Sequence, residues 1–470
     1  MAFIIKPLSG IKTTVTIPPD KSISHRALLM ASLCKGKTVI KPFLRSNDTL
    51  ATLDCMKRLG ISAELRDDNT LIVEGKGMLY LPPVPTVNLY ARESGTTMRI
   101  LSGILAGQKF DVLFDAEPSL ARRPMKRIVE PLRKMGANIS GSPSASRLAE
   151  GSPRRTPRGE PFKDNIFPPL VIRPVKHLKG KTFKLEIASA QVKSAILFAS
   201  LYADKKTTVI EPFHSRDHTE RMLKLFKAKI KIAGRKVTCR PVKKLCTPGK
   251  IFIPADFSSA AFLIVLALIL KKSAVTIKNV NINPTRCGLL NVLKRMGAKI
   301  KIVNKRAAYE PYADIIAEAS RLKGATVKRE EIPLMIDEIP ILCVAAAFAQ
   351  GITRIEGIKE LRIKETDRIA SMVSNLRGAG VDIADKPDGK DDWMMIVKGK
   401  ESYDGAHFVS HHDHRTAMSM IVFAMACGSG SSIDDLSCID KSFPEFVATV
   451  SNLYTLRNPV GVGHARPSKK

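Results

Sequence analysis

The chain has 470 residues, a length that predicts two or more domains with ample material for hydrophobic cores. Its 44% apolar and 26% charged content are those of a soluble globular protein, and its most apolar run, Ala260–Leu270, is well short of the roughly 20 residues that span a bilayer. The net charge of +32 predicts anionic partners and leaves open nucleic acid, a membrane surface, and small phosphates or carboxylates.

One unit recurs six times along the chain. A small-residue apolar helix opens it, and a tight turn, a short strand, a polar loop and a second, amphipathic helix follow. The helix-turn-strand parts are predicted at Ala27–Ile40, Met98–Phe114, Ala195–Ile210, Ala260–Ile277, Ile341–Ile355 and Ala417–Ile433. The second helices are predicted at about Thr52–Leu59, Arg127–Met135, Arg221–Phe226, Leu289–Met296, Ile369–Leu376 and Phe443–Leu453.

The alternation of helices and strands predicts an α/β protein with helices packed on sheets. The repeat is longer than the 20–45 residues of a solenoid unit, so closed lobes of three units each are expected. The segment Ile251–Asp256 is predicted to be a crossing strand, whereas residues 1–20 could pair with either lobe.

Three segments depart from the repeat. Ser140–Pro169 is rich in Gly, Pro, Ser and Arg, which predicts a surface loop. Lys227–Lys250 has nine basic residues and no acid, which suits either a solvated face or a polyanion site, and its Lys229–Ile232 alternation predicts a half-exposed strand. The tail Arg457–Lys470 is polar, basic and predicted to be loose.

The eight cysteines are scattered, and no pair has C-x-x-C spacing. We therefore expect neither a zinc site nor a redox pair, and a reducing cytosol fits this usage best. Met1–Lys6 is too short and lacks the charged region of an export signal.

A basic residue lies after each unit, just ahead of a helix N-terminus. Unpaired N–H groups and the helix dipole already favour anions at such positions. The residues are Arg45, Arg123, Arg216, Arg286, Lys364 with Arg368, and Lys441.

The segment Pro18–Arg26 precedes the first apolar helix. Asp20 or Ser22 is a plausible N-cap, which gathers Lys21, Ser22 and Arg26 near the helix start. A simple capped helix would not require a lysine, a hydroxyl and an arginine together, so this segment predicts an anion site.

Two further segments open apolar helices. In Arg92–Arg99, Gly95 would let a ligand approach the backbone closely. In Ala188–Ser194, the side chains of Ser189 and Gln191 could form hydrogen bonds to a phosphate or a sugar-like ring. An ordinary helix start is the alternative interpretation of both.

Acids and bases are mixed in two later segments. Met335–Pro340 places acids between apolar residues ahead of a buried helix, which suits either a functional carboxylate or helix capping. In Arg362–Arg368, Lys364 and Arg368 are predicted to share one helical face at i, i+4; an exposed salt-bridge cluster is the alternative.

The segment His411–Arg415 contains three histidines without an obvious carboxylate or cysteine complement, so no metal site is predicted. Its Arg415, and Lys441 in Asp440–Pro444, fit the pattern of cations at helix starts.

Taken in order, the motifs PPDKSISHRALL, SGTTMR, RRPM, SAQVKSA, SRDHTE, MIDE, ELRIKETDR, DHR and DKSFPEF resemble the 5-enolpyruvylshikimate-3-phosphate (EPSP) synthase family over roughly residues 5–455. SAQVKSA and MIDE are similar to the branch that includes glyphosate-tolerant bacterial enzymes. The resemblance implies a two-lobed enolpyruvyl transferase fold, an inside-out α/β barrel in which each lobe has three βαβαββ units. Lobe one would be residues 21–253, and lobe two residues 1–20 with 254–470, including a basic tail from about 457.

The implied reaction transfers the enolpyruvyl group of phosphoenolpyruvate to the 5-hydroxyl of shikimate 3-phosphate and releases phosphate, on the route to chorismate and the aromatic amino acids. The resemblance implies a cytoplasmic, monomeric enzyme with no cofactor, no metal, no specific nucleic acid and no membrane partner. We also expect mutual repulsion among the cleft cations to hold the empty site open.

Site residues follow from the resemblance position by position. Phosphoenolpyruvate would be held by Lys21, Gly95, Arg123, Gln191, Arg368, Arg415 and Lys441. Shikimate 3-phosphate would be held by Lys21, Ser22, Arg26, Ser189, Ala190, Gln191, Arg216, Asp337 and Lys364. The catalytic candidates are Asp337 as base and Glu365 as acid, assisted by Lys21 or Lys441. As an acid, Glu365 would need desolvation to raise its pKa.

Two departures from the family pattern stand out. Glu93 occupies a position that is often Asn, where it would weaken phosphate binding or need Arg92 as a partner. A basic insertion lies at about Ala149–Phe162.

Two alternatives remain. UDP-N-acetylglucosamine enolpyruvyl transferase shares the fold, but it is expected to carry a reactive cysteine in a mobile loop of lobe one, and this chain has none between Cys55 and Cys239. A nucleic-acid-binding relative, such as an RNA 3′-phosphate cyclase, fits the charge but not the low aromatic content of 6%.

Overall fold

The computed structural model describes residues 2–80, 82, 84–143, 165–389 and 392–455. The basic insertion, most of the predicted 140–169 loop and the tail from 457 lie outside the described residues. At the edges of that predicted loop, residues 140–142 and 167–169 belong to strands.

The predicted apolar helices are present in all six units. They are α1 (Lys21–Ser32), α3 (Gly95–Leu105), α6 (Ala190–Ser200), α8 (Phe257–Ile269), α10 (Ile339–Ala347) and α12 (His414–Met425). Each is buried around most of its circumference, as expected for a helix that is apolar on all sides. Five of them begin at a side-chain cap, because a Ser or Asp oxygen accepts a bond from a first-turn N–H: Asp20, Ser94, Ser189, Asp256 and Asp413.

The second helix of each unit is amphipathic. These helices are α2 (Asn47–Arg58), α5 (Lys126–Lys134), α7 (His218–Leu225), α9 (Gly288–Arg295), α11 (Arg368–Gly378) and α13 (Phe446–Thr455). Four are followed by a glycine with positive φ, the backbone conformation that ends a helix and starts the next strand: Gly60, Gly136, Gly297 and Gly380. Short helical turns complete the described elements: α4 (Pro118–Ala121), η2 (Arg329–Leu334), η3 (Ile336–Glu338), η4 (Lys359–Ile363) and η5 (Ser437–Lys441).

The strands of the first three units form three four-stranded sheets. In each, the first two strands in the spatial order pair in parallel and the other pairs are antiparallel. The sheets are β14 (Lys250–Phe252)-β3 (Lys35–Lys41)-β5 (Leu71–Lys76)-β4 (Ser62–Leu65), β6 (Thr86–Tyr90)-β7 (Asp111–Asp115)-β9 (Phe167–Arg173)-β8 (Asn138–Ser142), and β10 (Thr182–Lys184)-β11 (Thr207–Ile210)-β13 (Lys236–Cys239)-β12 (Ile230–Ala233).

The last three units repeat this pattern, with a shorter final sheet. The sheets are β2 (Lys12–Val15)-β15 (Ala274–Asn281)-β17 (Tyr312–Glu318)-β16 (Lys299–Arg306), β18 (Thr326–Val327)-β19 (Gly351–Ile355)-β21 (Asp392–Gly399)-β20 (Asp382–Asp388), and β22 (His407–Phe408)-β23 (Ser431–Ile433)-β1 (Phe3–Ile5). Residues 3–15 therefore pair with strands of the last three units.

Three of the described strands are exchanged along the chain. β14 follows the third unit but completes the sheet of the first. β1 and β2 precede the first unit but complete the sheets of the sixth and the fourth. The two crossing segments meet side by side: the N–H of Asp20 donates to the carbonyl of Pro254 at 2.8 Å, and the N–H of Asp256 donates to the carbonyl of Pro18 at 2.9 Å. The predicted crossing strand is thus present, although β14 is shorter than Ile251–Asp256.

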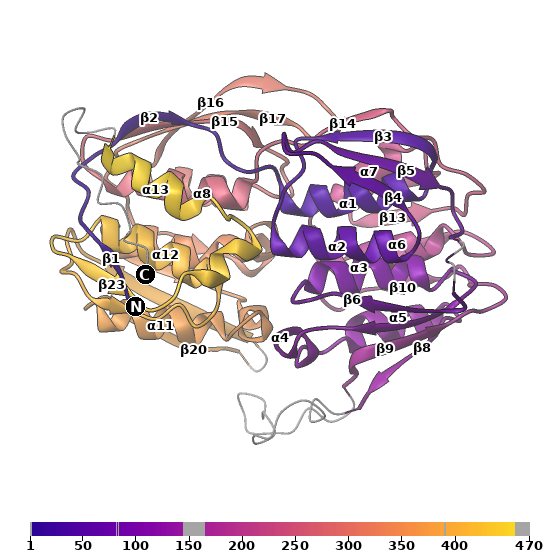
Figure 1. Cartoon of the computed structure of the whole chain (residues 1–470). Helices are drawn as coiled ribbons and strands as arrows, with labels where there is room; N and C mark the ends of the chain where they lie inside the picture. Colours follow the sequence, from indigo (N-terminus) through magenta and orange to yellow (C-terminus); the bar gives the residue numbers. More distant parts are fainter. Residues whose placement is uncertain (1, 81, 83, 144–164, 390–391, 456–470) are drawn as a thin grey trace, which may run out of the picture.

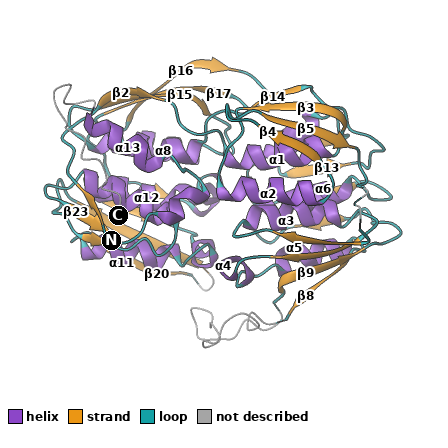
Figure 2. Ribbon diagram, viewed as in Figure 1, coloured by secondary structure: helices purple, strands orange, loops and turns teal. Residues whose placement is uncertain are grey.

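The buried side chains form two separate cores. One contains residues from Ile23 to Ile253, and the other contains Ile5 to Ile11 with Phe257 to Leu453. We call the parts of the molecule around them the first half and the second half. Figure 1 shows them side by side, and Figure 2 shows helices in the interior of each half with sheets on the outside. This is the predicted two-lobed α/β fold.

Along the described ranges, we find no helix with the length and apolarity that crossing a bilayer would require.

Candidate active site

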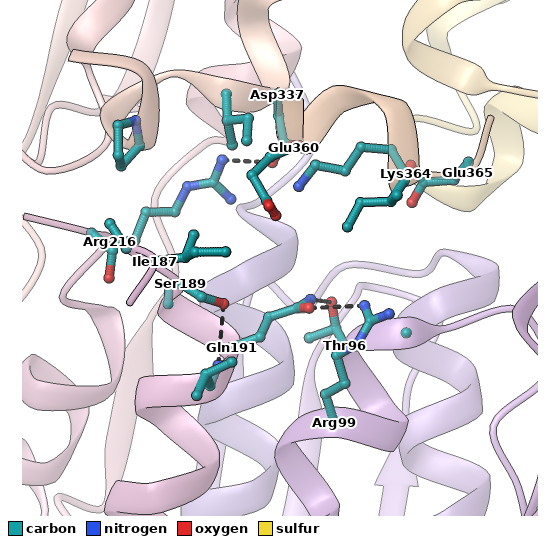
Figure 3. A pocket seen from close by; sticks show the side chains of 18 of the residues that line it. Thr96, Arg99, Ile187, Ser189, Gln191, Arg216, Asp337, Glu360, Lys364 and Glu365 are labelled. Atoms are coloured by element: carbon teal, nitrogen blue, oxygen red, sulfur yellow. Dashed lines mark hydrogen bonds and ion pairs between the residues drawn. The ribbon is translucent and has the colours of Figure 1, made fainter. Parts of the chain in front are cut away.

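A cavity of about 590 Å³ lies between the two halves. The first half contributes the starts of α1, α3 and α6 and the loop ahead of α7, and the second half contributes η3, η4, η5 and the starts of α11 and α12. Figure 3 shows the labelled side chains of the two halves facing each other across this space. Because helix N-termini carry unpaired N–H groups and a partial positive charge, the cavity suits anions.

Every predicted site residue lines this cavity. The set comprises Lys21, Ser22, Arg26, Gly95, Arg123, Ser189, Ala190, Gln191, Arg216, Asp337, Lys364, Glu365, Arg368, Arg415 and Lys441. The fold thus gathers residues that are up to 420 positions apart, while the role of each stays a prediction.

Three of the predicted cations pair with carboxylates of the opposite half. Arg216 Nη2 lies 2.5 Å from Asp337 Oδ2, and Arg123 Nη1 lies 3.4 Å from Glu365 Oε1. Lys441 Nζ lies 3.1 Å from Glu93 Oε2. Opposite charges therefore attract across the cavity. The expectation that the cleft cations repel one another counted the cations alone and left out these carboxylates.

Arg368 donates hydrogen bonds to three carboxylates. Its guanidinium donates to Asp413 Oδ2 at 2.8 Å, Asp337 Oδ1 at 3.2 Å and Glu365 Oε2 at 2.7 Å. The residue is buried, and three carboxylates around a planar fork of donors fix its orientation.

Asp337 is held as a carboxylate. Burial raises its pKa, but Arg216, Lys364, Arg415 and Arg368 outweigh burial, and the pKa lies well below the ordinary value of 3.8. When this carboxylate accepts a proton, it loses its favourable interactions with these cations.

Glu365 is also ionised. Burial raises its pKa, yet Arg368 and Arg123 hold it well below the ordinary value of 4.5. The desolvation that the acid role requires is therefore present, but the neighbouring guanidinium groups outweigh it in this arrangement of charges.

Lys364 does not share a helical turn with Arg368, contrary to the predicted i, i+4 face. It ends η4 in an extended conformation with φ −81° and ψ −152°, and α11 begins only at Arg368 after the cap Asp367. Both residues reach the cavity because the chain turns between them. Burial is the largest influence on the Lys364 pKa and lowers it, although Asp337 acts in the opposite direction.

A hydrogen-bonded chain forms the floor of the cavity. Arg99 Nη1 donates to Gln191 Oε1 at 2.9 Å, and Gln191 Nε2 donates to Thr96 Oγ1 at 3.1 Å (Figure 3). A Cβ at Gly95 would lie 2.8 Å from Arg99 Nη1 and 3.2 Å from Arg123 Nη1, so glycine leaves these two cations in place. Burial lowers the Arg99 pKa to about 9.

Several lining residues were not found from the sequence: Asp48, Arg99, Arg127, Glu360 and His414. Arg99 and His414 lie inside the quoted motifs SGTTMR and DHR, so the helix-start pattern could have found them. Nothing in the local sequence marks the other three. Asp48 pairs with Lys21 at 2.9 Å, and burial, with Lys21 and Arg415 nearby, lowers the pKa of His414 well below 6.5.

At two of the six repeated positions, the cation has another role. Arg286 is buried against Glu338 at 2.8 Å and Asp256 at 3.3 Å, although it still borders the cavity. Arg45 lies 3.7 Å from Asp67 and is not a lining residue. Arg92, the expected partner of Glu93, instead pairs with Asp54 at 2.6 Å.

Among the described residues, no three His, Cys, Asp or Glu side chains are grouped so that they could hold a metal ion. The eight cysteines are free thiols, and Cys246 alone among them is exposed.

Comparisons with known proteins identify the family. The sequence matches the family model EPSP synthase (3-phosphoshikimate 1-carboxyvinyltransferase) over residues 5–149 and 161–450. The chain is 44% identical over 448 residues to the 3-phosphoshikimate 1-carboxyvinyltransferase of Petrotoga mobilis, covering 95% of this chain and 98% of that protein. It is 42% identical over 450 residues to that of Thermoanaerobacter sp. (strain X514), covering 96% and 99%.

Solved structures agree. The EPSP synthase of Acinetobacter baumannii superimposes with a TM-score of 0.80 at 38% identity, covering 96% of this chain and 98% of that one. The enolpyruvyl transferase NikO of Streptomyces tendae superimposes with a TM-score of 0.72 at 15% identity, covering 96% and 97%, a likeness of fold alone. A cation-lined cavity between two three-unit halves, matched over nearly the whole length, places this chain in the EPSP synthase family, the 3-phosphoshikimate 1-carboxyvinyltransferases.

Proposed function

We propose that this chain transfers the enolpyruvyl group of phosphoenolpyruvate to the 5-hydroxyl of shikimate 3-phosphate and releases phosphate. The observation that carries the proposal is the convergence of cations from both halves on one cavity: Lys21, Arg26, Arg123, Arg216, Lys364, Arg368, Arg415 and Lys441. Two phosphates at about −1.5 to −2 each and two carboxylates bring roughly −5 to −6 into the site. Fixed cations and helix N-termini are what such a charge requires.

The two substrates divide the cavity. Lys21, Gly95, Arg123, Gln191, Arg368, Arg415 and Lys441 would bind phosphoenolpyruvate. Lys21, Ser22, Arg26, Ser189, Ala190, Gln191, Arg216, Asp337 and Lys364 would bind shikimate 3-phosphate. The start of α6 supports this division, because Ser189 caps that helix and Arg26 Nη2 donates to Ser194 one turn further on at 2.9 Å.

The reaction is an addition followed by an elimination. The 5-hydroxyl oxygen bonds to C2 of phosphoenolpyruvate while Asp337 takes its proton, and the methylene carbon gains a proton to become a methyl group. In the resulting tetrahedral ketal, the bond from C2 to the phosphate oxygen breaks, the methyl group returns a proton, and the enol ether and phosphate are the products. No electrons are exchanged with a cofactor in this sequence.

Glu365 is proposed as the group that protonates the methylene carbon, with Lys21 or Lys441 assisting. Its carboxylate is stabilised by Arg368 and Arg123, which are also proposed ligands of phosphoenolpyruvate. Binding of an anion at these guanidinium groups would compete with Glu365 for them and so raise its pKa toward the range of a general acid.

We also propose that residues 21–253 and residues 1–20 with 254–470 act as two lobes that close on the substrates. The separate cores and the ion pairs between the halves support this division. We propose further that the protein is a cytoplasmic monomer and that it needs no cofactor.

The motif at residues 189–195 supports placement in the branch that includes glyphosate-tolerant enzymes. Gly95 supports sensitivity instead, because a Cβ at this position would lie 2.8 Å from Arg99 Nη1 and 3.2 Å from Arg123 Nη1 and would crowd the cations that face the inhibitor. The test is to measure inhibition of the wild-type protein and of the Gly95→Ala variant by glyphosate. If glyphosate inhibits the wild type at micromolar concentration and Gly95→Ala relieves this inhibition, the protein lies outside the tolerant group.

The test of the function is phosphate release from phosphoenolpyruvate with shikimate 3-phosphate or UDP-N-acetylglucosamine as acceptor. We expect release with shikimate 3-phosphate alone. Release with UDP-N-acetylglucosamine alone, or with neither acceptor, would overturn the proposal.

A further inference from the structure

A buried cluster of charges lies directly behind the cavity wall. Lys193, on α6, has a side chain that is 2% exposed, and its Nζ lies 2.7 Å from Glu211 Oε2 and 2.7 Å from Glu220 Oε1. It also donates to the backbone carbonyl of Ser215 at 3.3 Å. None of the proposed catalytic steps uses this lysine, and it does not line the cavity.

The cluster joins two separate parts of the wall. One is the start of α6, where Ser189, Ala190 and Gln191 face the cavity two to four residues before Lys193. The other is the loop between β11 and α7, which contains Ser215 and Arg216. From this loop Arg216 extends toward Asp337, as Figure 3 shows.

An ammonium group matches this environment in number and charge. The ammonium group of Lys193 has three N–H donors, and three acceptors surround it: one oxygen from each glutamate and the Ser215 carbonyl. Glu211 also accepts a bond from the hydroxyl of Ser215, so the loop is attached to the cluster at two points of one residue. Burial alone would lower the pKa of Lys193, but Glu220 and Glu211 raise it above its ordinary value, and the lysine stays charged.

A buried cation with this geometry fixes the loop relative to the helix. A side chain without the charge would leave two buried glutamates unpaired and release the Ser215 carbonyl. Ser215 and Arg216 are adjacent, so release of that carbonyl would let the backbone that carries the Arg216 side chain move. The start of α6, held by its own capping bond and by Arg26, would be affected less.

We propose that Lys193 is a positioning residue for shikimate 3-phosphate: through Ser215 it holds Arg216 at the distance from Ser189 and Gln191 that the phosphorylated substrate requires. The proposal rests on the proposed function. It predicts a selective effect, because the proposed ligands of phosphoenolpyruvate, apart from Gln191 on α6, lie outside the two elements that Lys193 joins.

The test is Lys193→Met, a side chain of similar length without the charge. We expect the KM for shikimate 3-phosphate to rise about tenfold and the KM for phosphoenolpyruvate, at saturating shikimate 3-phosphate, to change by less than about twofold. Lys193→Arg restores the charge but not the three-way donor geometry, so its KM for shikimate 3-phosphate should lie between those of the wild type and Lys193→Met.

The matched control is Glu220→Gln. This substitution changes an equally buried side chain of the same cluster, and it leaves the bonds from Lys193 to Glu211 and Ser215 in place. Its KM for both substrates should stay within about twofold of the wild type. If Lys193→Met is unfolded at the assay temperature, Lys193→Met/Glu220→Gln replaces it, because removal of one cation and one anion keeps the formal charge of the cluster unchanged.

The outcomes separate the two proposals. An active wild type with an unchanged KM for shikimate 3-phosphate in a folded Lys193→Met variant overturns the positioning role alone. Equal increases in both KM values, or the same increase in Glu220→Gln, also overturn it, because they indicate a general loss of structure. A wild type that releases no phosphate with shikimate 3-phosphate overturns the proposed function and this inference together.

Discussion

Arg127 on α5 and Glu360 on η4 form a two-bond ion pair that joins the two halves beside the cavity. Arg127 Nη1 lies 2.6 Å from Glu360 Oε2, and Nη2 lies 2.9 Å from Oε1. Neither residue is among the proposed substrate ligands. The pair contributes instead to the contact between the halves, and its side chains are 43% and 28% exposed.

This geometry predicts a modest effect of removing either charge. An exposed ion pair contributes about 0.2–1 kcal/mol, so Arg127→Ala should lower kcat/KM by roughly two- to fivefold through weaker closure. The measurement is a double-mutant cycle with Glu360→Ala. The exchanged pair Arg127→Glu/Glu360→Arg should recover part of the loss, and a coupling energy of zero would show that the contact plays no part in closure.

The proposed role of Asp337 as the base predicts that its replacement lowers kcat by a much larger factor. Asp337→Asn keeps the size of the side chain but cannot accept the hydroxyl proton, so kcat should fall about 10²–10⁴-fold. Steady-state phosphate release measures it, and Asp385→Asn is the control, because Asp385 pairs with Arg362 rather than lining the cavity. Near-native turnover of Asp337→Asn would exclude Asp337 as the base.

Glu93 pairs with Lys441, a proposed ligand of phosphoenolpyruvate. Its Oε2 lies 3.1 Å from Lys441, so Glu93→Gln should release that lysine and lower the KM for phosphoenolpyruvate by roughly two- to fivefold. Ser119→Ala removes the other partner of Glu93, a hydroxyl at 2.6 Å, and keeps the charge pair. It should leave this KM nearly unchanged. An unchanged KM in Glu93→Gln would mean that the pair does not oppose substrate binding.

The depressed pKa values of Asp337 and Glu365 predict how stability depends on pH. A carboxyl whose folded pKa lies below its unfolded value stabilises the fold above the unfolded pKa, and this contribution is lost as the pH falls toward the folded pKa. With ordinary values of 3.8 and 4.5, the loss should begin below about pH 4.5. Thermal melting from pH 6 to pH 2.5 should therefore show a shallower decline for Asp337→Asn/Glu365→Gln than for the wild type. Parallel declines would contradict the assigned pKa directions.

The sequence was most informative where structure is local. Five of the six predicted apolar helices begin at Ser or Asp caps, and four of the second helices are followed by glycines with positive φ, because caps and left-handed turns act within a few residues. Several cations of the cavity, such as Arg123, Arg216 and Lys441, could be predicted because they occupy repeated positions just before helix starts, and the family motifs carry them. Arg99 and Arg127 also line the cavity and were not predicted.

The partners of those cations could not be predicted in this way. Arg216 and Asp337 are 121 residues apart, and Arg127 and Glu360 are 233 residues apart. No periodicity relates such positions, and they meet only after two halves have formed and packed together. The i, i+4 prediction for Lys364 and Arg368 was wrong for a related reason, because the chain leaves the helical path at Lys364 to bring both side chains to the cavity.

The exchanged strands β1, β2 and β14 determine the order in which the molecule can be completed during synthesis. The sheet of the first unit lacks a strand until residues 250–252 have left the ribosome, although its other strands end at residue 76. Residues 3–5 and 12–15 stay unpaired until later in synthesis, because their partners are β23 at residues 431–433 and β15 at residues 274–281. The nascent chain therefore keeps open strand edges for most of its translation. A cut between residues 253 and 254 would leave one fragment that carries β1 and β2 without their sheets, and another in which the sheets of the fourth and sixth units each lack a strand.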